Sequence, residues 1–126
     1  MGIEVVGIQH CNVRLETREQ AEDFYGRVLG LQRDPSMPWS DERKLIWWNL
    51  GQNGQLHTPI GERVNTTPSG RPIGPHFALA VKDIEAAKQT LEAEGIPYDE
   101  QVLPGRSLQL FVNDPAGNLV ELFQAE

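Results

Sequence analysis

Two stretches of the chain alternate between apolar and other side chains with the period of two that indicates a β-strand packed on one face. In the first stretch the residues suited to pack under a helix are Cys11, Val13 and Leu15, and the opposite face carries Ile8, His10, Asn12 and Arg14. In the second stretch the packing residues are Phe77, Leu79 and Val81, and the opposite face carries His76, Ala78 and Ala80. Both histidines are therefore predicted to point away from the helix layer, toward a cavity.

A stretch with the 3.6-residue period of an amphipathic helix follows each strand. Thr17 and Gln20 form the capping-box pattern that opens the first helix, and Asp83 is the N-cap at the equivalent place in the second. The apolar faces of the two helices consist of Ala21, Phe24, Tyr25 and Val28, and of Ile84, Ala87 and Leu91. Gly30 and Gly95 supply the left-handed cap that ends each helix. Each half of the chain thus begins as a strand followed by a helix.

Short strands follow each helix. We expect them at about 31–35, 44–50 and 54–58 in the first half, and at about 97–103, 107–113 and 118–124 in the second. The chain therefore contains a βαβββ unit twice, with modules at about 4–58 and 74–126, which predicts one α+β domain over residues 1–126. The linker at 59–73, rich in Pro, Gly and Thr, is long for a structureless connection and could act as a lid.

The two modules can be aligned through residues of similar kind. The spacing between equivalent residues falls slowly along the chain, from 66 for His10 and His76, to 65 for Gly30 and Gly95, to 64 for Trp47 and Phe111. Carrying the spacing of 64 forward places His57 on Glu121. The first strands thus contribute one equivalent pair and the last strands contribute another.

These two pairs carry metal-binding chemistry. A carboxylate such as that of Glu121, flanked by apolar residues on both strand faces, is costly to bury unless it is paired or binds a metal. Three imidazoles and a carboxylate suit one divalent ion, with Zn, Ni, Fe(II), Mn and Co all compatible. We therefore predict that His10, His57, His76 and Glu121 converge on one divalent metal ion, with Glu121 also the catalytic residue.

Each proposed ligand also has an alternative interpretation. A single histidine on a strand is more often a structural residue than a ligand, and Glu121 could face solvent on an edge strand. Gln55 shares the strand face of His57 and could replace it as a ligand. His57 would then be a hydrogen-bonding group beside the metal.

Three further residues are candidates for substrate binding. Arg14 lies on the strand face of His10, where it could hold a carboxylate or phosphate, or else form a salt bridge at the rim. Asn12 shares this face, and Trp48 is assigned to the same site. The tryptophans of the chain could equally lie in a core or a dimer interface. Cys11 is on the packing face and is expected to be a small buried hydrophobic residue, not a nucleophile.

Composition and charge exclude several classes of function. The 126 residues are 39% hydrophobic and 23% charged, and no apolar run approaches the roughly 20 residues that a membrane span needs. A formal net charge of −7, without a cluster of Lys and Arg, argues against nucleic acid and an anionic membrane surface as partners. The N-terminus lacks a secretory pattern and Cys11 is the single cysteine, so we expect a cytoplasmic protein.

Several short motifs together span nearly the whole chain. In the first module they are Ile8-Gln9-His10, Ala21-Glu22-Asp23-Phe24-Tyr25, Leu29-Gly30-Leu31 and Gln55-Leu56-His57. In the second they are His76-Phe77-Ala78-Leu79-Ala80-Val81 and Asp114-Pro115-Ala116-Gly117-Asn118-Leu119-Val120-Glu121-Leu122. With these motifs the chain resembles the vicinal oxygen chelate superfamily, which includes glyoxalase I, extradiol dioxygenases, methylmalonyl-CoA epimerase, and fosfomycin- and bleomycin-resistance proteins.

The resemblance implies a paired βαβββ fold whose sheets form a cup, with metal ligands at the positions of His10, His57, His76 and Glu121. Glyoxalase I usually has a glutamate where His57 stands. In such enzymes the metal binds two neighbouring oxygens of a small oxygenated substrate and stabilises the anion that forms, so the resemblance implies a metal-dependent lyase, isomerase or dioxygenase. The alternative is a metal-free protein that binds a small molecule or drug, as bleomycin-resistance proteins do. Paired modules of this type generally associate, so we expect a homodimer.

Overall fold

Within its described residues, each half of the chain has a helical segment and four strands in the order that the sequence predicts. The computed structural model describes residues 2, 4, 8–51, 54–61, 76–102 and 107–125. Module one consists of β1 (His10–Asn12), α1 (Arg18–Ala21), η1 (Glu22–Val28), β2 (Gln32–Arg33), β3 (Leu45–Asn49) and β4 (Gln55–Pro59). Module two consists of β5 (His76–Val81), α2 (Ile84–Ala93), β6 (Asp99–Val102), β7 (Leu108–Asn113) and β8 (Leu119–Gln124). The βαβββ unit therefore occurs twice.

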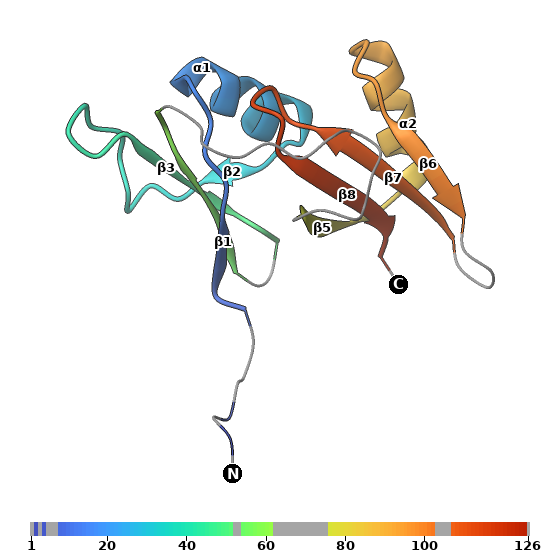
Figure 1. Ribbon diagram of the computed structural model, residues 1–126, viewed down its shortest axis with the longest axis horizontal. Coiled ribbons are helices and arrows are strands. Elements are labelled where there is room, and N and C mark those ends of the chain that lie inside the picture. Colours follow the sequence, from blue (N-terminus) through green and yellow to red (C-terminus); the bar gives the residue numbers. More distant parts are fainter. Residues whose placement is uncertain are drawn as a thin grey trace.

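The strands of each module form one four-stranded mixed sheet. The strand order is β1-β4-β3-β2 in module one and β5-β8-β7-β6 in module two. In each sheet the first strand runs parallel to the last strand, and the other strand pairs are antiparallel. Figure 1 shows the two sheets side by side, and no strand pairing joins them within the described residues. β1 and β5 are thus edge strands of separate sheets.

The strand register confirms the alignment of the modules. His57 on β4 lies opposite Trp47 on β3, and Glu121 on β8 lies opposite Phe111 on β7. Residues 64 apart therefore occupy equivalent places at this point of the two sheets, and His57 is the structural counterpart of Glu121.

The helix of module one differs from the regular α-helix that its period predicts. Thr17 and Gln20 form the expected capping box, in which the Thr17 side chain accepts from the Gln20 backbone N–H at 3.2 Å. After one α-helical turn the chain continues as the π-helix η1, whose wider hydrogen bonds include one from Leu29 N–H to the Phe24 carbonyl. Within η1, the adjacent side chains of Phe24 and Tyr25 are both buried.

The remaining helix ends follow the prediction. Asp83 caps α2 by accepting from the Ala86 backbone N–H at 3.1 Å. Gly30 and Gly95 have φ angles of 71° and 68°, the left-handed conformation expected of a glycine cap. Within the described part of the chain, no helix is long and apolar enough to cross a membrane.

One hydrophobic core joins the two modules. Residues from both sheets and from the helical segments contribute to it, among them Phe24, Ile46, Trp48, Leu56, Leu91, Leu110, Val112 and Val120. Tyr25 of η1 donates a buried hydrogen bond of 2.7 Å to Asp114 of module two, and Arg27 forms an ion pair of 2.9 Å with Glu94. These contacts orient the modules, and each sheet places its other face, here called the site face, opposite this core.

The junction after module one begins later than the expected linker at 59–73. Pro59 still belongs to β4, and Ile60 forms a parallel bridge with Leu15. The strand extends further because the backbone of Leu15 offers hydrogen-bonding partners to the residues just beyond its predicted end. The Leu15 N–H donates to the Pro59 carbonyl, and the Leu15 carbonyl accepts from the Gly61 N–H. The rest of the predicted lid, from residue 62 on, lies outside the described residues.

Candidate functional site

Module one stacks three rings on its site face. The rings of His10 on β1 and His57 on β4 have centroids 4.2 Å apart and an interplanar angle of 17°. Trp47 on β3 stacks on His57 with a centroid distance of 4.4 Å and an angle of 8°. Since His57 is only 8% exposed, burial, followed by the nearby charge of His10, lowers the pKa of His57 below its ordinary value. This favours the neutral imidazole, the form that binds metals.

Hydrogen bonds lead from His57 to a carboxylate at the end of β2. Gln55 Oε1 lies 3.0 Å from His57 Nε2, and Gln55 Nε2 donates to Asp34 at 2.6 Å and to Asn49 at 3.2 Å. Asp34 also accepts from the hydroxyl and backbone N–H of Ser36. These bonds, those from Ser36 foremost, lower the pKa of Asp34, which is therefore ionised near neutral pH.

Module two pairs a histidine with a carboxylate at the equivalent places. His76 Nε2 on β5 lies 3.3 Å from Glu121 Oε1 on β8, and Glu121 Oε2 accepts from Gln109 Nε2 at 3.2 Å. The Glu121 side chain is 14% exposed. The ring of His76 meets Phe111 edge to face at 6.4 Å. Glu121 thus lies on the histidine-bearing face of its sheet, and its burial is matched by polar partners, as expected for an ionisable group.

The structure brings the four predicted ligands together as two pairs, not as one group. His10 is stacked on His57 in the first sheet, and His76 contacts Glu121 in the second. Among the described residues, no cluster of three or more His, Cys, Asp and Glu side chains could hold a metal ion. Strand alternation determines the face on which each side chain lies, but the packing of the modules decides whether two such faces meet.

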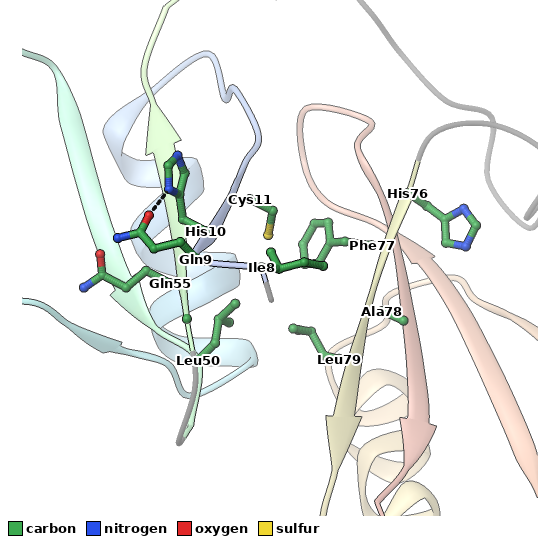
Figure 2. A pocket seen from close by; sticks show the side chains of 11 residues that line it. Ile8, Gln9, His10, Cys11, Leu50, Gln55, His76, Phe77, Ala78 and Leu79 are labelled. Atoms are coloured by element: carbon green, nitrogen blue, oxygen red, sulfur yellow. Dashed lines mark hydrogen bonds between the residues drawn. The ribbon is translucent and has the colours of Figure 1, made fainter. Parts of the chain in front are cut away.

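A pocket of about 830 Å³ lies between the edges of the two sheets. Most of its lining is apolar, and it includes Ile8, Cys11, Leu50, Phe77 and Leu79. Figure 2 shows His10 and His76 on opposite sides of this pocket, with the ring of His76 directed away from His10. Burial raises the pKa of the Cys11 thiol, which agrees with the expectation that Cys11 is not a nucleophile.

The structure corrects the assignment of Trp48 to the substrate site. Trp48 is 2% exposed in the core, and its indole N–H donates to Thr58 Oγ1 at 3.0 Å. Adjacent residues of a strand point to opposite faces, so Trp47 and not Trp48 lies beside His57. The alternation of side chains along the strand is visible in the sequence, and it could have identified Trp47 as the tryptophan on the site face.

The other two proposed substrate residues, Asn12 at the end of β1 and Arg14 just after this strand, are both exposed. Asn12 lies opposite His57 in the parallel register of β1 and β4. Arg14 follows two residues later, and its backbone carbonyl accepts from Asn118 Nδ2 at 2.9 Å. Both side chains are therefore accessible to solvent, and Asn12 lies next to His57.

Comparison with known proteins identifies relatives along nearly the whole chain. The family model of the Glyoxalase/Bleomycin resistance protein/Dioxygenase superfamily matches residues 7–122. A lactoylglutathione lyase of Pseudomonas putida is 29% identical over 146 aligned positions, which cover 91% of this chain and 83% of that protein.

Solved structures agree with this result. A protein of Bacillus anthracis assigned to the glyoxalase family superposes with a TM-score of 0.78 at 27% identity, covering 100% of both chains. TnmS3, an antibiotic binding protein of a Streptomyces species, shares the fold with a TM-score of 0.71 at 21% identity, covering 99% of this chain and 100% of that chain. The chain therefore belongs to the Glyoxalase/Bleomycin resistance protein/Dioxygenase superfamily.

Proposed function

We propose that this protein is a metal-dependent enzyme that acts on a small oxygenated molecule. The proposed metal ligands are His10 and His57 of one chain together with His76 and Glu121 of a second copy. The contact between His76 and Glu121 at 3.3 Å carries this proposal, because it joins a nitrogen donor to the one anionic donor of the set. The stacked histidines occupy the equivalent places of the other sheet.

The donor set fits a divalent ion only when both pairs contribute to it. Each pair supplies two donors, and four donors suit a tetrahedral or more open site. In a two-fold dimer, the site face of module one in each copy would pack against the site face of module two in the other copy. The dimer would then contain two identical sites. β1 and β5 each have one edge without a partner strand in the described residues, the edge beside the pocket, so a strand of another chain could pair with either sheet there. We therefore propose a homodimer.

The surrounding residues suit a small oxygenated substrate. A metal in this site would act as a Lewis acid toward two neighbouring substrate oxygens. Glu121 can hold a proton beside that position, while its hydrogen bond from Gln109 keeps the carboxylate in place. Trp47 offers a flat apolar surface next to His57. The relationship to the Pseudomonas putida lactoylglutathione lyase favours a lyase reaction, and His57, where glyoxalase I usually has a glutamate, makes a different substrate the expectation.

Mixed dimers test where the metal site is assembled. One dimer pairs a His10→Gln chain with a Glu121→Gln chain, and its matched control pairs a wild-type chain with a His10→Gln, Glu121→Gln double variant. Each dimer carries the same two substitutions in total. If the sites form between chains, the first dimer keeps one intact site and the control keeps none.

Two differently tagged chains allow each mixed dimer to be purified, and elemental analysis gives its metal content. We expect half of the wild-type metal content in the first dimer and close to none in the control. The opposite result would place each site within one chain. Wild-type protein that binds none of the candidate metals would refute the proposed enzyme.

A metal-free binding protein is the second candidate. The apolar pocket of about 830 Å³ and the ring stack ending in Trp47 favour it, since both suit a flat, largely apolar ligand. Quenching of tryptophan fluorescence by aromatic drugs in the presence of a chelator, lost on Trp47→Leu, would support this function. Quenching that remains in Trp47→Leu would exclude the ring stack as the binding surface.

A further inference from the structure

The amide of Gln55 has one orientation that suits both of its neighbours. An ionised carboxylate has no hydrogen to donate, so the Gln55 atom at 2.6 Å from Asp34 is the NH₂ group. The second hydrogen of this group is directed to Asn49 Oδ1 at 3.2 Å. The carbonyl oxygen of Gln55 then faces His57, because the reversed amide would place the Gln55 oxygen against the carboxylate oxygen of Asp34.

This orientation determines which nitrogen of His57 carries the hydrogen. Gln55 Oε1 can only accept, so His57 Nε2 at 3.0 Å is the donor. A neutral imidazole has one N–H and one lone pair. The lone pair of His57 is therefore on Nδ1.

We propose that Asp34, acting through Gln55, is a positioning residue that holds His57 as the Nε2–H tautomer and leaves Nδ1 to bind a metal. The inference rests on the proposed role of His57 in the site. A hydrogen bond to the second ring nitrogen commonly sets the tautomer and orientation of a ligand histidine. Here His57 donates that hydrogen bond to the amide oxygen of Gln55, and the orientation of this amide depends on the carboxylate of Asp34, two strands away.

The sheet holds Asp34 in the required place. Asp34 directly follows β2, and its backbone N–H donates to the Trp47 carbonyl at 2.9 Å. One carboxylate oxygen accepts from Ser36, which leaves the other oxygen for Gln55. Asp34, Trp47 and His57 thus lie in one row across β2, β3 and β4.

Nitrogen-15 NMR of the metal-free protein tests the tautomer directly, at a pH well above the histidine range. In the wild type we expect the long-range spectrum of His57 to show the hydrogen on Nε2 and the lone pair on Nδ1. Asp34→Asn keeps the shape of the side chain but adds a donor, so that Gln55 can turn its NH₂ group toward His57. The spectrum of this variant should shift toward the Nδ1–H tautomer.

Two further variants complete the test. Gln55→Leu removes the acceptor and should let both tautomers of His57 appear. Gln101→Leu removes an amide that donates to Gln109 in module two, and should leave His57 unchanged. Calorimetry should show that Asp34→Asn weakens metal binding by about 10–100-fold, the usual effect of losing a partner of a ligand.

The outcomes separate this inference from the proposed function. A wild-type His57 with its hydrogen on Nδ1, or the same tautomer in wild type, Asp34→Asn and Gln55→Leu, would overturn the role of Asp34 even if the protein binds metal. The expected tautomers in a protein that binds no metal would confirm the positioning by Asp34 and reject the metal-dependent enzyme.

Discussion

The site faces of the two modules carry equivalent residues with different chemistry. In module one His57 is stacked on two rings and is linked to the Asp34 carboxylate through Gln55. In module two Glu121 occupies the equivalent place and contacts His76 directly. One half thus offers two imidazoles, and the other offers an imidazole and a carboxylate. The comparison teaches that the first strands of the two modules carry the same kind of donor, whereas the last strands carry an imidazole in one module and a carboxylate in the other.

The core faces of the same strands differ as well. Trp48 and Thr58 of module one stand where module two has Val112 and Leu122, 64 residues later. Trp48 donates to the Thr58 hydroxyl, which in turn donates to the Ile46 carbonyl at 3.1 Å. Module one therefore depends on a buried hydrogen-bond chain at a place where module two uses apolar contact alone.

Replacing Trp48 should have the largest effect, because it removes a large buried side chain from the core of module one. We expect Trp48→Ala to lower the free energy of unfolding by about 3–5 kcal/mol, as measured by urea denaturation. Trp47→Ala is the matched control on the other face of the same strand, where the side chain is only partly buried, and should cost clearly less. Equal losses for the two variants would contradict the assignment of the two faces.

Replacing Glu121 should sharpen the comparison between the two halves of the proposed metal site. Glu121→Gln removes the only anionic ligand while nearly preserving shape, whereas His57→Gln removes a neutral ligand that has Gln55 beside it. We expect Glu121→Gln to weaken metal affinity by more than about 100-fold, beyond what an outer partner typically contributes, and His57→Gln to weaken it less. Calorimetric titration of one metal into both variants and the wild type measures this order, and a larger loss for His57→Gln would reverse it.

The smallest expected effect is the pH dependence contributed by His57. Because the folded protein lowers the pKa of His57, the unfolded chain binds more protons as the pH falls below about 6.5. The free energy of unfolding therefore has its full value, as far as His57 is concerned, above that pH. It decreases as the pH falls from there through the pKa of His57 in the folded protein. Unfolding free energies measured in metal-free protein between about pH 7.5 and pH 5 should fall less steeply for His57→Gln than for the wild type. Identical slopes would show that burial does not perturb His57.

Much of the fold could be predicted because the relevant signals are local. Strand alternation assigned His10 and His76 to the face opposite the helices, and Thr17, Gly30, Asp83 and Gly95 marked the helix ends. The slowly falling spacing between the modules placed His57 on Glu121, and the strand register confirms it. These features depend on the chemistry of neighbouring residues and on the period of two, which every strand obeys.

Two features of the site required the tertiary structure. Asp34 and Gln55 are 21 residues apart, and no pattern of spacing relates them, since their contact depends on the pairing of β2 with β3 and of β3 with β4. The separation of the ligand pairs depends on how the modules pack, through contacts such as that of Tyr25 with Asp114. By itself the sequence determined which face of which strand carries each donor. Only the packing of the modules decided which faces meet, because that orientation results from many side-chain contacts between segments distant in the chain.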